Sequence, residues 1–186
     1  SAASGPLLPE PRWRDVGRNC IELRRLYTQT GALQIRKAVL EGIRRAERIV
    51  YLENPYLYEN EVAAALVEAR RRGVDVRVVL PLGTDNPGGN SSNYVTANYL
   101  LANDVRVYLY PGMTHVKALV IDGWACLGSA NFNHLSLRLN QEVNVATSDA
   151  ATVERLRCEL FEVDFDKSHE LREPIPVGWT DHVVEE

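Results

Sequence analysis

A regular alternation of strand and helix patterns between residues 48 and 110 limits this chain to few folds. The run RIVYLEN (48–54) is rich in β-branched and aromatic residues and is followed by proline, which predicts a strand that ends in a loop. A helical pattern over 60–73 begins at Asn60, a good N-cap residue, and VDVRVVLP (74–81) predicts a second strand. Strands that alternate with helices predict a layered α/β fold with a mixed sheet.

The rest of the chain extends this pattern. Apolar residues at helical spacing predict a helix over 32–48, and a capped apolar pattern predicts another over 148–165. The remaining expected elements are a helix over 93–103, strands over 105–110, 115–121, 124–128 and 140–147, and a polar loop over 82–92. We expect a linker or N-terminal arm over 1–30, a domain over 31–170 and a C-terminal tail over 171–186. The start at Ser1 predicts a processed or truncated product.

Charge and apolar content narrow the possible partners. The net charge of −4 and the pI of about 5.6 disfavour broad nucleic-acid binding, which needs a basic footprint. The arginine clusters at 44–48 and 69–73 fit solvated helix ends, with an anionic lipid or a nucleic acid as the alternative. No apolar run reaches the roughly 18 residues of a membrane span. We therefore expect a cytoplasmic or peripheral membrane protein.

The three cysteines, Cys20, Cys126 and Cys158, lack the spacing of a zinc site. Their odd number also disfavours a disulfide framework, so we expect buried free thiols.

The segment THVKALVIDGWACLGSANFN holds the residues that carry chemistry. His115 and Lys117 are two apart on an expected strand and so share a face, as do Ser129 and Asn131 after the next strand. An Asp-Gly pair at 122–123 predicts a two-residue hairpin turn that brings both pairs into one patch. Lys, Ser and Asn donate to phosphate oxygens, and His can attack phosphorus or transfer protons. A lone strand histidine is usually structural, but this combination predicts a phosphate site.

The same segment resembles the HKD motif of the phospholipase D superfamily. That motif reads His-x-Lys, four residues, Asp, about six residues and Gly-Ser-x-Asn. The matching residues are His115, Lys117, Asp122, Gly128, Ser129 and Asn131. Only five residues separate Asp122 from Gly128, which a tighter hairpin turn explains. The flanking segments over about 24–170 resemble the second half of cardiolipin synthase-like and bacterial phospholipase D-like proteins. The resemblance implies an α/β fold in which helices flank both faces of a mixed β-sheet.

The resemblance also implies roles for these residues. His115 is expected to form a phosphohistidine, while Lys117, Ser129 and Asn131 hold the phosphate oxygens. Glu142 matches the acidic residue that orients the catalytic histidine in this superfamily, although a solvated strand carboxylate is the alternative. Asp122 is expected to be structural in the turn, as is Gly128 in the motif. Neither a metal nor another cofactor is expected.

The chemistry needs a second histidine to protonate the leaving group, and the sequence has no second motif. His134, His169 and His182 are not followed by Lys two residues later. The chain therefore resembles half of an active site, either one half of a two-motif protein or a single-motif protein that pairs as a homodimer. The linker-like start favours the first reading, so the expected partner is a second HKD half.

Three functions remain open at this point. The favoured function is a phosphodiesterase or phosphatidyltransferase domain that acts on phospholipid at a membrane surface. The first alternative is a homodimeric nuclease of the same superfamily, which the acidic pI disfavours. The second is a non-catalytic interaction domain with a vestigial half-site, which the intact set of motif residues disfavours.

Overall fold

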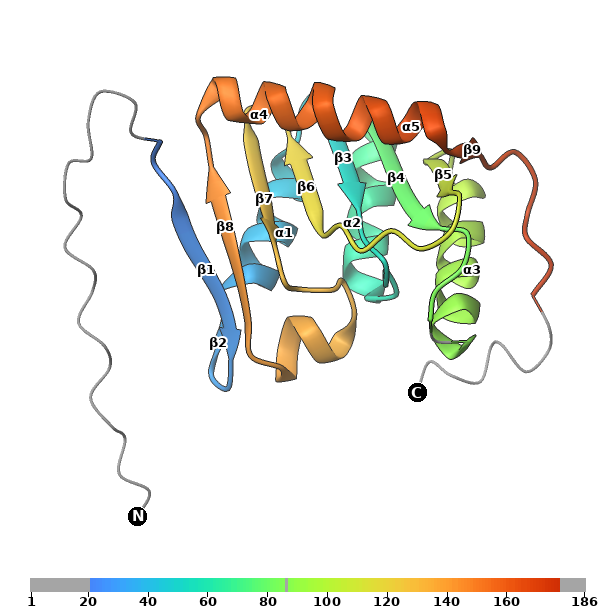
Figure 1. Ribbon diagram of the computed structural model, residues 1–186, viewed down its shortest axis with the longest axis horizontal. Coiled ribbons are helices and arrows are strands. Elements are labelled where there is room, and N and C mark those ends of the chain that lie inside the picture. The colour runs from blue at the N-terminus through green and yellow to red at the C-terminus, as the bar shows by residue number, and fades with distance from the viewer. Residues whose placement is uncertain (1–20, 86, 178–186) are drawn as a thin grey trace, which may run out of the picture.

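The computed structural model describes residues 21–85 and 87–177, which form one mixed β-sheet with helices against both faces (Figure 1). The strand order in the sheet is β2-β1-β8-β7-β6-β3-β4-β5-β9. The neighbours β3, β4 and β5 run parallel, whereas β6, β7, β8 and β1 are joined by antiparallel pairings. This confirms the predicted fold class.

The strands are β1 (Arg24–Gln29), β2 (Ala32–Leu33), β3 (Ile49–Glu53), β4 (Asp75–Pro81), β5 (Arg106–Tyr110), β6 (Ala118–Ile121), β7 (Trp124–Gly128), β8 (Glu142–Thr147) and β9 (His169–Glu170). The helices are α1 (Gln34–Arg45), α2 (Asn60–Arg71), α3 (Pro87–Leu101), α4 (Ala150–Leu156) and α5 (Val163–Lys167), and the π-helical segments are η1 (Leu135–Leu139) and η2 (Arg157–Glu162).

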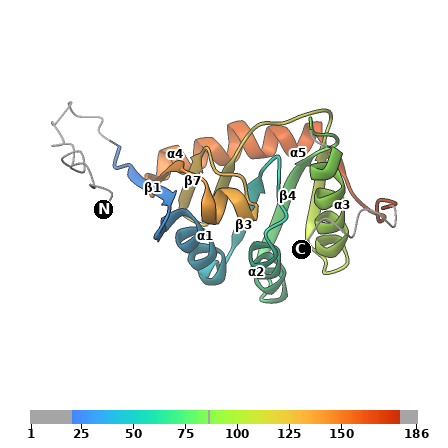
Figure 2. The same cartoon turned by 90° about the horizontal axis from the view of Figure 1, so that it is seen from below.

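The sheet separates two apolar layers, because its central strands are covered on both sides. Figure 2 shows α1, α2 and α3 along one face and the run from α4 to α5 along the other. On β3, Val50 and Leu52 belong to the larger core cluster, while Tyr51 packs in the second cluster with Phe161 and Phe165. The alternation of side chains on a strand explains this division. It also explains why β3 reads as a continuous apolar run.

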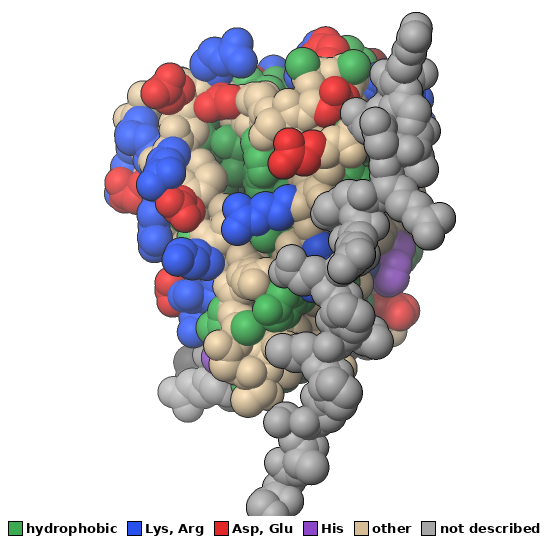
Figure 3. All heavy atoms as spheres, turned by 90° about the vertical axis from the view of Figure 1, so that its left-hand side faces the viewer, with side chains coloured by type: hydrophobic (Ala, Val, Ile, Leu, Met, Phe, Trp, Pro, Cys, Tyr) green, Lys and Arg blue, Asp and Glu red, His purple; other side chains and the backbone are tan. Residues whose placement is uncertain are grey.

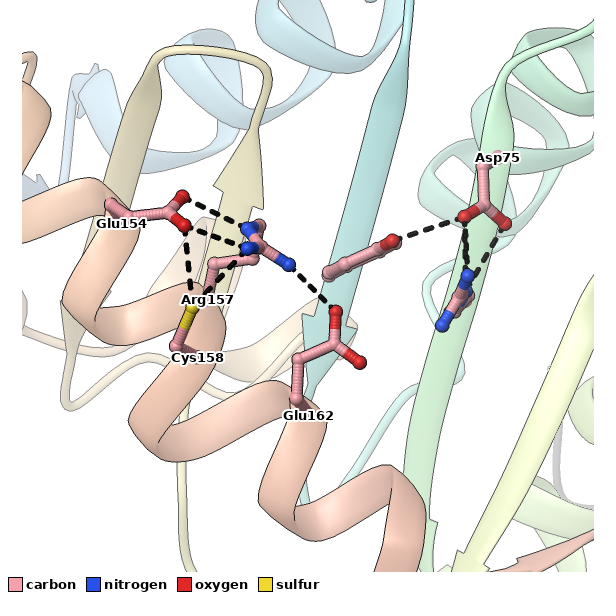
Figure 4. A network of polar contacts seen from close by, with 7 residues as sticks. Asp75, Glu154, Arg157, Cys158 and Glu162 are labelled. Carbon is pink, nitrogen blue, oxygen red and sulfur yellow. Dashed lines mark hydrogen bonds and ion pairs between the residues drawn. The ribbon is translucent and has the colours of Figure 1, made fainter.

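Ion pairs join side chains along the α4–α5 run (Figure 4). The Arg157 guanidinium donates to Glu154 at 2.7 Å and to Glu162 at 2.7 Å. On the sheet beneath, the Tyr51 hydroxyl donates to Asp75 at 3.0 Å. Burial, with the nearby Asp75 charge, raises the pKa of Tyr51 to about 12. The first two contacts lie within the α4–α5 run, and the third joins β3 to β4.

Two expectations about segment boundaries are wrong. The loop expected over 82–92 is shorter, because α3 begins at Pro87, a residue type suited to the first turn of a helix. Residues 24–29, expected in the arm, form β1 and pair with β8 from Arg24↔Ala146 to Thr28↔Glu142. A short element was expected only near 21–27, within the arm, whereas Leu26 of this strand lies in the main core.

The arginine clusters largely serve the fold. Arg72 donates to the carbonyl oxygens of Ile43 and Ala46 at 3.0 and 3.2 Å, so it caps the carboxyl end of α1. Figure 3, which faces the β1 edge, shows Lys and Arg side chains interspersed with acidic ones on the side of α1. Arg45 pairs there with Glu41 at 2.7 Å. These contacts agree with the predicted position of the arginine clusters at solvated helix ends.

Cys126 is a buried free thiol, as expected. Cys158 is a free thiol but an exposed one, so the expected burial is wrong for this residue. Cys20 and His182 lie outside the described residues. In the part of the chain that the structure describes, no helix combines the length and the apolar character that a membrane crossing requires.

Candidate functional site

The motif is built on the hairpin of β6 and β7. Ile121 pairs with Trp124 across a two-residue turn, and Ala118 pairs with Leu127 at the other end of the hairpin. Asp122 adopts a positive φ of 48°, a conformation that Asp tolerates better than most residues. The tight turn accommodates the shortened spacing of the motif and leaves the two arms in register.

His115 and Lys117 lie just before β6, in an extended segment that follows β5. The expected strand over 115–121 therefore begins three residues late, at Ala118. The Lys117 ammonium nitrogen lies 3.4 Å from each ring nitrogen of His115. Burial lowers the pKa of Lys117, and the negative charge of Glu142 acts in the opposite direction. The expected His-Lys pair thus forms a compact cationic group beside Glu142.

Ser129 and Glu142 meet across the ends of β7 and β8. The Ser129 hydroxyl donates to the Glu142 carboxylate and accepts the backbone N–H of Val143 at 3.0 Å. No hydrogen bond joins Glu142 to His115 within 21–85 and 87–177. The expected orienting contact is therefore absent here, and Ser129 is the side chain that binds the carboxylate.

Two buried asparagines, Asn54 and Asn144, bind the backbone of the segment that contains Asn131. Asn54, at the end of β3, donates to the carbonyl of Ala130 at 3.3 Å and accepts from the N–H of Phe132 at 3.2 Å. Asn144 accepts from the N–H of Ala130 at 3.2 Å. The Asn131 side chain itself has no hydrogen-bond partner among the described residues, and its Oδ1 is buried. Its neighbours on both sides are thus fixed while its own amide stays available.

Gly128 and Asp122 have structural surroundings. A Cβ at Gly128 would collide with the backbone of Val143 and Asn144, so this close approach of β7 and β8 requires glycine. The Asp122 carboxylate accepts the N–H groups of Glu47, Arg48 and Ile49 at 3.0, 2.9 and 2.9 Å. Asp122 therefore ties the hairpin tip to the start of β3, at the end of β6 away from Lys117.

A buried acidic residue, Glu53, lies beneath the loop that carries His115. Only 1% of Glu53 is exposed, and its Oε1 accepts the hydroxyl of Thr114 at 2.5 Å. Thr114 Oγ in turn accepts the N–H of Val116 at 3.3 Å. Burial raises the pKa of Glu53 to about 7; the Thr114 bond and Lys167 lower it, while Asp164 raises it.

Sequence reasoning missed Glu53 and Asn54. A signal for Glu53 was present, because a charged residue closes the otherwise apolar strand IVYLE. Asn54 was interpreted only as a loop residue before Pro55. Its bonds reach residues more than 70 positions away, so no local pattern reveals them.

Of the other histidines that the structure describes, neither His134 nor His169 forms a hydrogen bond with a motif residue. His134 is exposed before η1, and His169 is exposed on the edge strand β9. Among the described residues, no cluster of three His, Cys, Asp or Glu side chains could hold a metal ion.

Comparisons with known proteins agree with this geometry. The family described as "Cardiolipin synthase, PLD-like domain" matches residues 39–163. Cardiolipin synthase A from Pseudomonas entomophila is 35% identical over 135 residues, which cover 71% of this chain and 28% of that protein. The chain thus spans less than a third of the length of this curated relative.

Two solved structures share the fold. Nuc from Salmonella typhimurium, a phospholipase D family member, aligns with a TM-score of 0.71 at 21% identity, over 82% of this chain and 99% of that chain. A phosphatidylserine synthase from Haemophilus influenzae aligns with a TM-score of 0.67 at 12% identity, over 90% of this chain and 44% of that chain. The family match, the sheet and the motif hairpin together show that this chain belongs to the cardiolipin synthase type of phospholipase D-like domain.

Proposed function

We propose that this chain supplies one half of a phosphodiesterase or phosphatidyltransferase site that acts on phospholipid phosphodiesters. The observation that carries the proposal is the position of Lys117 against His115, with both ring nitrogens 3.4 Å from the ammonium. A cation at this distance from a nucleophile can neutralise the phosphate that the nucleophile attacks. The membership of the family supports the same chemistry.

In the proposed first step, a ring nitrogen of His115 attacks phosphorus and the bond from phosphorus to the leaving oxygen breaks. A second histidine, from another HKD half, protonates that oxygen. Water or an alcohol then attacks the phosphohistidine, which releases His115 and yields the hydrolysed or transferred product. The absence of a second His-x-Lys in this sequence supports the need for a partner half, either in the same protein or in a second copy.

Three side chains are proposed to hold the phosphate oxygens. Lys117 supplies the positive charge, while Ser129 and Asn131 supply neutral donors. The Ser129 hydroxyl must turn from Glu142 to reach a phosphate, and the Asn131 amide has no competing partner among the described residues. The site therefore has an arrangement that phosphate binding can complete.

Glu142 is proposed to serve both neighbours. Its charge favours the protonated form of Lys117, and its bond to Ser129 holds that hydroxyl in place before substrate arrives. Once phosphate draws Ser129 away, the carboxylate is free to accept from His115 and fix its tautomer, as the resemblance implies. A groove of about 480 Å³ along β1 and β8 reaches Glu142 and can receive another part of the substrate.

The decisive experiment traps a phosphorylated protein. The chain is incubated with radiolabelled phosphatidylglycerol, alone and with a catalytically competent partner half, and is quenched at alkaline pH, where phosphohistidine survives. With the partner half present, we expect label on the wild-type chain and on His134→Asn, an exposed-histidine control, but none on His115→Asn. Label that persists on His115→Asn would exclude His115 as the nucleophile.

Labelled DNA tests the nuclease alternative, which we retain because the fold is similar to that of Nuc. Turnover of DNA without turnover of lipid would replace the lipid proposal. Phosphate binding needs no second half, so a titration with inorganic phosphate separates the steps. Perturbed amide signals at 115–117 and 128–131 are expected in wild type and lost in Lys117→Met.

A further inference from the structure

We propose that Glu53 is a positioning residue for His115 and acts through the hydroxyl of Thr114. This inference rests on the proposed function, in which His115 is the nucleophile. No hydrogen bond among the described residues joins Glu53 to His115, Lys117, Ser129 or Asn131, and neither the motif nor its spacing includes it. Its position at the end of β3, under the loop from β5 to β6, places it next to the one segment that carries the nucleophile.

The hydrogen bonds form a short chain around His115. Thr114 donates to the buried Glu53 carboxylate at 2.5 Å, and the same hydroxyl oxygen accepts the N–H of Val116 at 3.3 Å. The two bonded residues lie directly before and after His115, so together they restrain its backbone. A hydroxyl that donates to a charged oxygen is also a better-fixed acceptor, because its proton is committed in one direction.

The surroundings of Glu53 indicate that its carboxyl group has a role beyond packing. The neighbouring strands place the apolar residues Val79 and Ala118 beside it, and the charged groups that act on it are Asp164 and Lys167 of α5. Its Oε2 is buried without a hydrogen-bond partner among the described residues. Burying such an oxygen costs free energy that an apolar residue would avoid. The hydrogen bond from Thr114 offsets part of that cost.

Asp164 lies close enough to act on Glu53 both through its charge and as a hydrogen-bonding carboxyl. The negative charge of Asp164 disfavours the ionised form of Glu53, in the same direction as burial. The ionisation of Glu53, with a pKa of about 7, therefore changes the strength of the Thr114 bond. His115 is thus held by an anchor that responds to pH near neutrality.

Matched variants of the 186-residue chain separate the anchor from general stability. Thr114→Val removes the hydroxyl, and Thr114→Ser retains it. Glu53→Gln keeps an oxygen for Thr114 and cannot ionise. The readout is the amide nitrogen shift of Val116 between pH 5 and 9, followed by NMR. In a His115→Asn background, which removes the neighbouring imidazole, we expect an inflection near pH 7 with Thr114 or Thr114→Ser that disappears in Glu53→Gln and Thr114→Val.

Lipid turnover by the same proteins, with a competent partner half, provides the functional readout. We expect Thr114→Val to lower kcat at least tenfold with KM within twofold of wild type, and Thr114→Ser to recover most of the loss. The proposal is overturned if the Val116 titration in the His115→Asn background is the same with Glu53 and with Glu53→Gln. It is also overturned if Thr114→Ser and Thr114→Val lose activity equally.

The two proposals fail in different ways. If His115→Asn keeps full lipid turnover, the proposed function falls, while the Val116 titration still decides whether Glu53 holds the loop. If Thr114→Val does not fold, the titrations of Thr114→Ser and Glu53→Gln decide the question by themselves.

Discussion

The ammonium nitrogen of Lys117 lies 3.4 Å from both ring nitrogens of His115 and donates to the carbonyl oxygen of the same residue at 3.2 Å. Lys117 therefore lies over the imidazole ring and remains bound to the backbone that carries it. The arrangement fixes a positive charge beside the proposed nucleophile without help from another subunit.

Replacement of Lys117 by Met should abolish this charge with little effect on the fold. We expect phosphate affinity and turnover to fall by roughly 10²- to 10³-fold, the usual effect of losing a group that stabilises transition-state charge. Lys37→Met is the matched control, because Lys37 is exposed on α1 away from the hairpin. Phosphate binding that is equal in both variants would remove Lys117 from the site. Isothermal titration with inorganic phosphate and steady-state assays measure the two effects.

The pH dependence of phosphate binding should depend on Glu142. Burial lowers the pKa of Lys117 and the charge of Glu142 opposes that shift. Glu142→Gln removes the opposing charge, so Lys117 should lose its proton at a lower pH and phosphate binding should weaken earlier as pH rises. NMR of the Lys117 side chain from pH 7 to 11 follows this change. Glu159→Gln, an exposed change on η2, should leave the curve in place, and an unshifted curve in Glu142→Gln would contradict the argument.

Asn54 should matter more than a loop residue normally does. Asn54→Ala removes buried bonds to Ala130 and Phe132 on either side of Asn131, and we expect a loss of about 2–3 kcal/mol in the free energy of unfolding. Urea unfolding followed by circular dichroism gives the value. Asn140→Ala is a suitable control, since Asn140 is exposed. Equal stability of the two variants would show that Asn54 does not brace this segment.

How much of this site could be predicted depends on how far apart in the sequence the contacting residues lie. The β6–β7 hairpin could be predicted because its turn, its two strands and four motif residues lie in one short window. Glu53 left a signal as a charged residue at the end of an apolar strand, but its partner Thr114 could not be predicted, because the sequence does not specify locally that β3 pairs with β6. The role of Asn54 could not be predicted either, because its partners Ala130 and Phe132 lie more than 70 positions away. The bond between Ser129 and Glu142 was also missed: residue types place a carboxylate near the site without saying which neighbour it will accept from.

The fold shows the same limit. The strands that read as apolar runs, such as β3 and β4, were found where expected, since both faces are buried. β1 was assigned to an arm because it is an exposed, charged strand whose pairing with β8 brings together residues more than 100 positions apart. The motif was therefore easier to predict than the sheet edge beside it.

Asp122 should contribute stability rather than catalysis. Its carboxylate accepts three backbone N–H groups, and these bonds lower its pKa even though burial acts to raise it. Asp122→Ala should cost about 2 kcal/mol and lower Tm by roughly 4–8 °C in a domain of this size. Because the pKa of Asp122 is lower in the folded state, its ionised carboxylate stabilises the fold at pH values above the pKa that Asp122 has in the unfolded chain. This contribution should be lost as the pH falls below about 4. Thermal unfolding at pH 7 and pH 3 tests both statements, and Asp122→Asn should lose less because it retains one acceptor oxygen.

Glu53 should make the chain less stable as pH rises through neutrality. Its pKa is raised from 4.5 to about 7 in the fold, so the native state binds a proton more tightly than the unfolded state does. The contribution of Glu53 to the free energy of unfolding should therefore be highest below about pH 4.5. It should fall by about 3 kcal/mol between pH 4.5 and 8. Other groups titrate over the same range, so the comparison is made with Glu53→Gln, which cannot ionise. Urea unfolding at half-unit pH steps should give parallel curves for the two proteins above pH 8 and a difference that grows between pH 5 and 7. Curves that stay parallel throughout would mean that Glu53 ionises in the fold as it does in the unfolded chain.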